Sequence, residues 1–492
     1  MHFALISETC IRRLFKGGLL CFFIFLGFSG TLSAQSSHLQ AYAKEMKEAE
    51  TLLDQGRNAE GIQAARLIAA RVVAEKAPSS DKALSEIQMW LGHRYMSIGH
   101  YQEAEHSYSS ALNHLQQFQK DEVLPQAEAH FALSLTFLQS GMASRAETEL
   151  KTAMEFQSQA GIGLPYCKSL EQLAGLQLLR GQDADAEIHY LRLSHLHDSL
   201  EGPMSTSLAR TLNNLGGVYA GRGFEERAKG AYEQALNIQQ QTGNQIELST
   251  TLTNLGVLYD GLDEYEKSLD YLQKAFKIRK ENLPPADPMF LTSLDNLVGL
   301  MVKNQKYEAV QALLQQTKRE REQRFGGDSP LVAEILDRFA TFALAREQGN
   351  VALAYFQEAL KIRENSLGSQ SPQLAANLYN LGKLENLLSK TEQARIHLNW
   401  GLDIYEYQTI GNESQVTAIL SELFVCDFIQ GKLDAAEKDL DLMRAIKSEV
   451  YGPSHPETLA VMEELANFYR NSRRPDEAEL VESDILRLRS QK

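Results

Sequence analysis

Residues 208–238, LARTLNNLGGVYAGRGFEERAKGAYEQALNI, hold the pattern that decides the fold. Large apolar residues recur every three or four positions in the first half, at Leu208, Leu212, Leu215 and Tyr219. This spacing predicts an amphipathic helix over 205–220. Gly221-Arg222-Gly223 ends that helix, and a second apolar stripe predicts another helix that ends at Gly243-Asn244. The stretch is therefore one helix–turn–helix unit.

The same unit recurs along the chain at a nearly fixed distance. We call the position of Gly216 the anchor position, and its copies are Gly92, Ser134, Ala174, Gly216, Gly256, Val298, Ala340, Gly382, Phe424 and Ala466. Successive anchors are 42 residues apart, except for two steps of 40. A fixed period between about 20 and 50 residues is typical of a solenoid, in which each unit packs on its neighbours.

Glycine at the anchor position needs a packing reason. Gly216 lies in the middle of a predicted helix, where glycine is about 1 kcal/mol less favourable than alanine. We therefore expect the backbone of a neighbouring helix to approach at this point. Aromatic residues on the second helices are expected to fill the complementary spaces, at Tyr108, Tyr190, Tyr232 and Phe356.

A second periodic feature marks the start of the first helix in several units. Proline stands ten residues before the anchor at Pro288, Pro330, Pro372 and Pro456. Proline is favoured in the first turn of a helix, where its missing N–H would be unpaired anyway. His455 lies in the linker before one of these prolines, and we expect a structural role for it.

These residues resemble the tetratricopeptide repeat (TPR) family. The pattern L-G-x-x-Y … A-x-x-x-[FY] … A is met at Leu91, Gly92, Tyr95, Ala104, Tyr108 and Ala111, and again at Leu215, Gly216, Tyr219, Ala228, Tyr232 and Ala235. The long unit is similar to the kinesin-light-chain type of TPR. The resemblance implies an all-α fold, a right-handed α-solenoid of about eleven stacked units. A degenerate first unit would cover 35–76 and ten further units 77–492. The unit around Val298 departs most, with Val310 and Thr317 at the alanine positions, so we expect a degenerate spacer or a distorted packing joint there.

The first 34 residues predict a signal peptide. Arg12, Arg13 and Lys16 precede an apolar run over 19–26, and small residues follow up to Ala34. The run is well short of the ~20 residues that span a bilayer, so we favour cleavage after Ala34 over an uncleaved anchor. We expect an exported protein, periplasmic in the bacterial cell envelope or secreted, with no integral membrane segment after cleavage.

Charge and cysteine content narrow the partners and the chemistry. The formal net charge is −15, and an acidic surface repels phosphate backbones, so we expect no nucleic-acid partner. Cys10 and Cys21 would leave with the signal peptide. Cys167 and Cys426 lie six repeats apart, too far for a disulfide, which requires Cα atoms within about 7 Å. We expect both to be buried and unpaired.

No motif in the sequence predicts catalysis. We find no catalytic residues, no cofactor and no metal site, so we expect no enzyme activity. His195-Leu196-His197 places two imidazoles at i and i+2 of a helix, which do not share a face. We interpret the pair as solvated surface rather than as a metal site.

Polar residues recur two positions before the anchor in five successive units, and we call them the polar series. It consists of Asn214, Asn254, Asn296, Arg338 and Asn380. Asparagine competes with the helix backbone for hydrogen bonds, so its recurrence inside helices requires an explanation. By resemblance to kinesin-light-chain repeats, these residues line a concave groove and pair with the backbone of an extended peptide, because an amide both donates and accepts. Arg210, Asn213 and Asp260 would add selectivity for the side chains of that peptide. The alternative is that the asparagines bond the neighbouring helix and stabilise stacking. In the N-terminal units this position holds Trp90, Ala132 and Gln172, so a groove there would be more apolar.

Three functions follow from these features. The first is an exported, non-enzymatic scaffold that binds a protein or peptide in its concave groove. The second is a regulatory or sensory subunit of a complex whose peptidase or kinase domain lies on another chain. The third is an envelope assembly adaptor that uses its convex face, with self-association into a homo-oligomer as one form of it.

Overall fold

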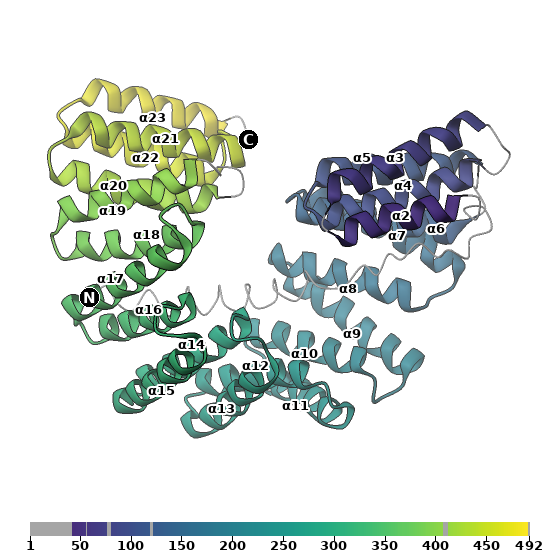
Figure 1. The fold of residues 1–492 in the computed structure, drawn as a ribbon, viewed down its shortest axis with the longest axis horizontal. Helices are drawn as coiled ribbons and strands as arrows, with labels where there is room; N and C mark the ends of the chain where they lie inside the picture. Colours follow the sequence, from purple (N-terminus) through teal and green to yellow (C-terminus); the bar gives the residue numbers. More distant parts are fainter. Residues whose placement is uncertain (1–41, 56, 76–79, 119–121, 407–411, 491–492) are drawn as a thin grey trace. The chain divides into compact units, whose positions relative to one another are not determined.

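A computed structural model describes residues 42–55, 57–75, 80–118, 122–406 and 412–490, and within these ranges the chain forms 22 helices and no strand (Figure 1). Successive helices pair as hairpins, so the prediction of an all-α stack of about eleven helix–turn–helix units is confirmed. The predicted signal peptide lies outside the described residues. No helix among the described residues is long and apolar enough to cross a membrane.

The chain divides into two compact units between Ile278 and Arg279, within α13. The first unit contains α2 (Ala43–Asp54), α3 (Asn58–Glu75), α4 (Ser80–Ser97), α5 (Tyr101–Phe118), α6 (Val123–Gln139), α7 (Ala143–Ala160), α8 (Leu164–Leu179), α9 (Asp183–Glu201), α10 (Thr206–Gly221), α11 (Glu225–Thr242), α12 (Gln245–Gly261) and most of α13 (Tyr265–Asn282). The second contains the end of α13, α14 (Pro288–Lys303), α15 (Tyr307–Phe325), α16 (Pro330–Ala345), α17 (Gly349–Leu367), α18 (Pro372–Leu387), α19 (Thr391–Glu406), α20 (Glu413–Ile429), α21 (Leu433–Tyr451), α22 (Pro456–Asn471) and α23 (Pro475–Ser490).

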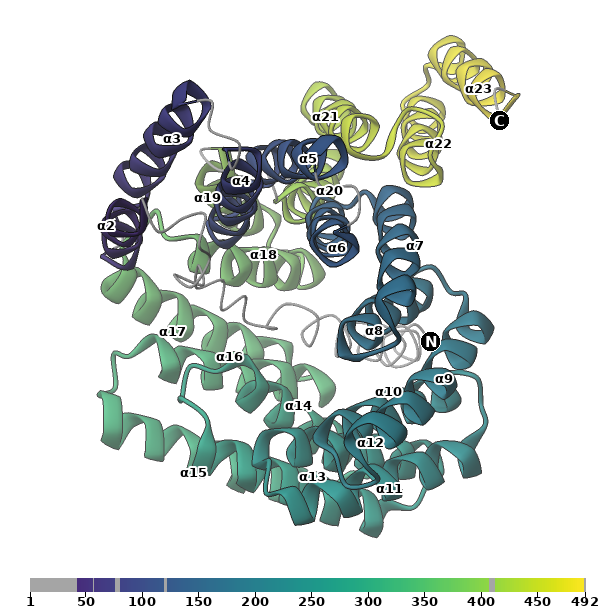
Figure 2. The same ribbon diagram turned by 90° about the vertical axis from the view of Figure 1, so that its right-hand side faces the viewer.

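Packing within each unit follows the order of the chain. The two helices of a hairpin pack together, and the second helix packs on the first helix of the next hairpin, as α5 does on α6 and α17 on α18. The first helices of neighbouring hairpins also touch, as α4 touches α6 and α18 touches α20 (Figure 2). Each repeat thus buries its apolar stripe only against its neighbours, which is how a solenoid is held together.

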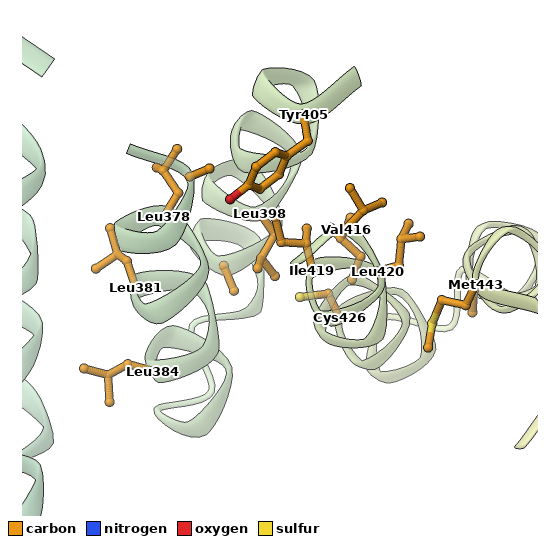
Figure 3. Close-up of a cluster of buried hydrophobic side chains, with 14 of the residues drawn as sticks. Leu378, Leu381, Leu384, Leu398, Tyr405, Val416, Ile419, Leu420, Cys426 and Met443 are labelled. Carbon is orange, nitrogen blue, oxygen red and sulfur yellow. The ribbon is translucent and has the colours of Figure 1, made fainter. Parts of the chain in front are cut away.

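The core consists of the apolar residues at these contacts. In the second unit, Leu381 of α18, Leu398 of α19 and Ile419 of α20 meet in one buried cluster (Figure 3). In the unit around Val298, the departures Val310 and Thr317 are both buried, but α15 packs on α14 much less extensively than α17 packs on α16, as expected for a distorted packing joint. Cys167 and Cys426 are free and buried, as predicted.

Each anchor glycine faces a large side chain of the second helix, and only at Gly256 is a main-chain atom, the carbonyl oxygen of Ser268 at 3.3 Å, also among the nearest atoms. A Cβ added to Gly216 would lie 2.7 Å from two ring carbons of Tyr232, which is fully buried on α11. At Gly382 the nearest atom is Cγ of Leu398, at 2.5 Å. The expectation that a neighbouring backbone approaches Gly216 was therefore wrong, because a large side chain of the second helix of the same hairpin occupies that space.

From the hairpin of α4 and α5 onwards, the turn inside each hairpin has one residue in the left-handed backbone region, always seven residues after the anchor. These residues are Gly99, Gly141, Gly181, Gly223, Asp263, Gln305, Glu347, Ser389, Gly431 and Arg473, with φ between 58° and 78°. In the turn after α10, the N–H of Phe224 donates to the carbonyl of Tyr219 (2.8 Å), the bond that closes a helix end of the Schellman type.

The linker prolines and their neighbours begin the first helices, as predicted. Pro288, Pro330, Pro372 and Pro456 all lie in the first helical turn. Nδ1 of His455 accepts a hydrogen bond from the N–H of Glu457 (3.2 Å), so its predicted structural role is that of a helix cap.

A buried arginine series connects successive repeats of the second unit, and the sequence analysis missed it. Arg279, Arg321 and Arg363 stand 23 residues after their anchors, and each is at least nine-tenths buried. Arg321 donates to the carbonyls of Leu331 and Pro285 and forms an ion pair with Glu334 (2.8 Å). The 42-residue spacing of these arginines was visible in the sequence and is the signal that could have revealed them.

Candidate peptide-binding face

The residues of the predicted polar series stand at the same register position of the first helices in both units. We call the side of each helix that carries them the A-face. It is the side of α10, α12, α14, α16 and α18 that carries Asn214, Asn254, Asn296, Arg338 and Asn380. Asn380 is exposed and the other four are partly buried. Because residues at i, i+3 and i+7 share a helix face, the positions one and five residues after the anchor lie on the A-face as well.

Three polar side chains join α10 to α12 on the A-face of the first unit. Oδ1 of Asn213 accepts hydrogen bonds from Nδ2 of Asn254 and from Oγ1 of Thr251, both at 3.0 Å. The bond therefore brings two of the predicted residues together, and it uses one N–H of the Asn254 amide for stacking. A carboxamide has two N–H donors and a carbonyl acceptor, so the Asn254 amide has hydrogen-bonding capacity beyond this one bond.

Arg210 lies between two carboxylates from the neighbouring repeats. Its Nε is 3.2 Å from Glu171 of α8, and its Nη1 is 3.8 Å from Glu247 of α12. Burial raises the pKa of Glu247, Arg210 opposes this rise, and the like charge of Glu171 adds to it. Arg210 thus lies between two carboxylates that are largely shielded from solvent, and the selectivity for peptide side chains predicted for it stays a prediction.

The remaining predicted residues of the first unit lie along the same face. Asn214 neighbours the buried hydroxyl of Tyr190 on α9, whose pKa is raised by burial. Asp260 is partly buried near the end of α12. The A-face of this unit therefore combines amides with charges of both signs.

The A-face of the second unit is more strongly ion-paired. Arg338 of α16 makes a bidentate contact with Asp295 of α14, at 3.0 and 2.9 Å. The adjacent Asp337 accepts hydrogen bonds from the buried Arg363 and from Asn377 of α18 (3.1 Å). Arg338, which interrupts the asparagine series, thus acts as a link between α14 and α16. Asn296 and Asn380 flank this link on α14 and α18.

The polar position continues beyond the series that the sequence analysis recognised. Two residues before the next anchors stand Glu422 of α20 and Glu464 of α22, both partly buried. The register of the repeat predicts their positions, whereas a series defined by amides ends at Asn380.

A hollow of about 360 Å³ lies on another part of the first unit, between α9, α10 and α11. Its lining includes His195, Met204 and Leu212. His197 does not reach it, because its side chain is only 5% exposed and its Nδ1 lies 2.8 Å from Glu201. The interpretation of both histidines as solvated surface was thus wrong for His197. Among the described residues, no group of three or more His, Cys, Asp or Glu side chains is placed to hold a metal ion.

The match to a family sequence model agrees with this architecture. The sequence model of the tetratricopeptide repeat family matches residues 207–281 and 331–406, which correspond to α10–α13 and α16–α19. No curated protein matches the chain significantly. The chain is similar to the crystal structure of BtubC (BKLC) from P. vanneervenii, with 22% identity over 50% of this chain and 94% of that one and a TM-score of 0.41.

Two further solved structures are similar. Repeats of a putative kinesin light chain from Podosopora anserina are 20% identical over 41% of this chain and 95% of that one, with a TM-score of 0.36. The apo form of RapI is 12% identical over 75% of this chain and 98% of that one, with a TM-score of 0.47. Given the family match, the two matched segments are tetratricopeptide repeats, and the described part of the chain repeats the same helix–turn–helix unit.

Proposed function

We propose that this chain is an exported, non-enzymatic scaffold that binds a peptide or protein segment along the A-face of its first helices. The observation that carries the proposal is the recurrence of half-exposed amides at one position of successive first helices. An amide can donate to a peptide carbonyl and accept from a peptide N–H, so a row of them suits an extended backbone of varied sequence.

A bound peptide has to accommodate the hydrogen bond that Asn254 already makes within the protein. This bond, to Asn213, serves the stacking of α10 on α12. A bound peptide would use the remaining hydrogen-bonding capacity of that amide together with those of Asn214 in the same unit. In the second unit, Asn380 is exposed and offers its whole amide.

A paired pull-down from native cell-envelope extract tests this proposal. The first bait is the mature chain, and the second carries alanine at Asn214, Asn254, Asn296 and Asn380. A matched control bait carries alanine at four exposed asparagines of second helices, Asn113, Asn237, Asn365 and Asn399. Circular dichroism and thermal melting of all three baits would check that helicity and stability are comparable.

The pattern of capture separates the functions. A partner retained by the mature chain and the control, but lost by the A-face variant, is the expected result. A partner retained equally by all three baits would place the interaction on the second helices or on the N-terminal repeats, as an envelope adaptor would require. Specific turnover of a substrate by the purified mature chain would contradict the non-enzymatic part of the proposal.

A further inference from the structure

The A-face of the second unit changes character at its C-terminal end. Five residues after the anchor, the first helices carry Lys303, Ala345, Leu387, Ile429 and Asn471 in turn. Leu387 and Ile429 are 74% and 62% exposed. On α20 the exposed Val425 and Phe428 lie beside Ile429, at the spacing of residues that share a helix side. We call Leu387, Val425, Phe428 and Ile429 the apolar ridge.

Contacts between α18 and α20 hold the ridge together. Nδ2 of Asn386 donates to the main-chain carbonyl and to the carboxylate of Glu422, both at 3.1 Å. Sγ of Cys426 donates to Oδ1 of the same amide at 2.9 Å. Since Asn386 adjoins Leu387, and Glu422 precedes Val425 by one helical turn, these bonds fix the two halves of the ridge beside each other.

A cluster of aromatic rings from α20 and α22 packs against Phe428 of the ridge. The anchor of this repeat is Phe424 instead of a small residue, and its ring lies 5.8 Å from that of Phe428. Both rings meet Phe468 of α22 edge to face, at 6.0 and 6.1 Å. The exposed part of Phe428 is therefore presented by a packed cluster, which lowers the conformational entropy lost on binding.

Two carboxylates border the ridge without a cationic partner. Neither Glu422 nor Glu464 forms an ion pair within the described part of the chain, whereas nearby acids do. Asp427 pairs with Arg395, Glu437 with Arg474 and Glu463 with Arg489. Burial alone raises the pKa of Glu464, as expected for a carboxylate that lacks a neutralising neighbour. Lys383 stands one helical turn before Leu387 on the same face of α18, where it lies over the ring of Tyr379.

We infer that the apolar ridge and its two bordering glutamates form a binding site for a peptide segment that carries large apolar side chains next to lysine or arginine. The inference rests on the proposed function and names the ligand chemistry for one part of the A-face. Apolar contact would supply affinity, because burying large exposed side chains is favourable. Glu422 and Glu464 would select basic neighbours, since bringing a cation to a half-buried carboxylate offsets its desolvation.

The test measures binding of three fluorescein-labelled peptides of about twelve residues to the full mature chain by anisotropy. The first peptide combines phenylalanine and leucine with lysine, the second replaces lysine by glutamate, and the third replaces the apolar residues by serine. We expect the first peptide to bind at least tenfold more tightly than either of the others, a difference of about 1.4 kcal/mol or more.

Two pairs of variants locate the binding on the ridge. Leu387→Ser with Ile429→Ser should weaken binding of the first peptide about tenfold, whereas Leu480→Ser with Leu486→Ser, at two equally exposed leucines of α23, should leave it unchanged. Glu422→Gln with Glu464→Gln should weaken binding and reduce its salt dependence. Glu364→Gln with Glu449→Gln, at exposed sites on second helices, is the charge control.

Several results would overturn the inference. Equal or tighter binding of the acidic peptide would do so, as would unchanged binding by the ridge variants or weak binding of all three peptides. A mass in light scattering that falls only in the ridge variants would instead assign the ridge to a second copy of this chain. If the pull-down on the four asparagines succeeds while the peptides fail, the proposed function stands and only this inference falls.

Discussion

At the scale of single residues, fit inside a hairpin decides the identity of the anchor. Glycine at position 216 has a low helix propensity, but a larger residue does not fit there because the ring of Tyr232 fills the space where its side chain would stand. Gly230, also within a helix of the same hairpin, has nothing within 4 Å of an added Cβ. The two glycines therefore have the same intrinsic cost and opposite packing environments.

Substitution by alanine should separate these two effects. Gly216→Ala should destabilise the protein by roughly 1–3 kcal/mol, because the methyl group forces the Tyr232 ring to move. Gly230→Ala should stabilise it by up to about 1 kcal/mol through helix propensity alone. Urea unfolding followed by circular dichroism measures both, and equal effects of the two changes would contradict the packing account.

Asp439 of α21 makes stability depend on pH. Burial and the neighbouring Asp427 raise its pKa to about 7, against the opposing charges of Arg395 and Lys438. An acid whose pKa is raised in the folded state binds a proton more tightly there, so its ionisation lowers stability as the pH rises from about 4 to 7. Asp439→Asn should therefore be more stable than the wild type at pH 8, with a smaller difference at pH 5. A difference that does not change between these pH values would contradict the assignment.

At the scale of the helical elements, the turns show where sequence prediction reached its limit. The periodic apolar stripes and linker prolines were sufficient to predict the helix–turn–helix units. They did not predict that every hairpin from Gly99 onwards places a left-handed residue seven positions after its anchor. Half of those positions hold Asp, Gln, Glu, Ser or Arg, so the usual glycine signal is absent there. These turns are closed by the same backbone hydrogen bond as the glycine turns, for example from the N–H of Lys306 to the carbonyl of Met301 (2.8 Å).

Exchanges at equivalent turns should change stability in opposite directions. Gln305 has φ of 58° and Gly223 has φ of 75°. A non-glycine residue in this region destabilises the folded state by roughly 1–2 kcal/mol. Replacement by glycine removes this strain, but glycine loses more backbone entropy on folding, so the net gain in stability is smaller. Gln305→Gly should therefore stabilise the protein by about 0.5–1 kcal/mol, and Gly223→Ala should destabilise it by a similar amount. Thermal or urea unfolding measures both changes, and the same sign for both would contradict this reasoning.

At the scale of the whole molecule, the register of the repeat predicted more of the candidate site than the residue types did. The 42-residue period located the A-face, but the pairing of Arg338 with Asp295 and of Asn254 with Asn213 depends on which side chains from adjacent repeats come within hydrogen-bond distance. That information is tertiary and is not contained in a single repeat. The period also predicts the positions of Glu422 and Glu464, which a series defined by asparagine leaves out.

Export is a property of the whole chain that the first residues predict. N-terminal sequencing of protein recovered from the periplasm or the medium should begin at Gln35, after removal of the segment with Arg12, Arg13 and Lys16. A chain that begins at Met1 and remains in the cytoplasm or the membrane pellet would contradict cleavage and export.

The central claim is that a partner lies along the A-face, and site-specific photo-crosslinking in native extract tests it most directly. A photoreactive residue would replace Val257 or Lys383, one position after the anchors of α12 and α18. Matched controls would replace Gln234 or Glu358, exposed on the second helices α11 and α17. The account predicts that the same partner is captured from one or both A-face positions and from neither control. Capture from the second helices alone would contradict it.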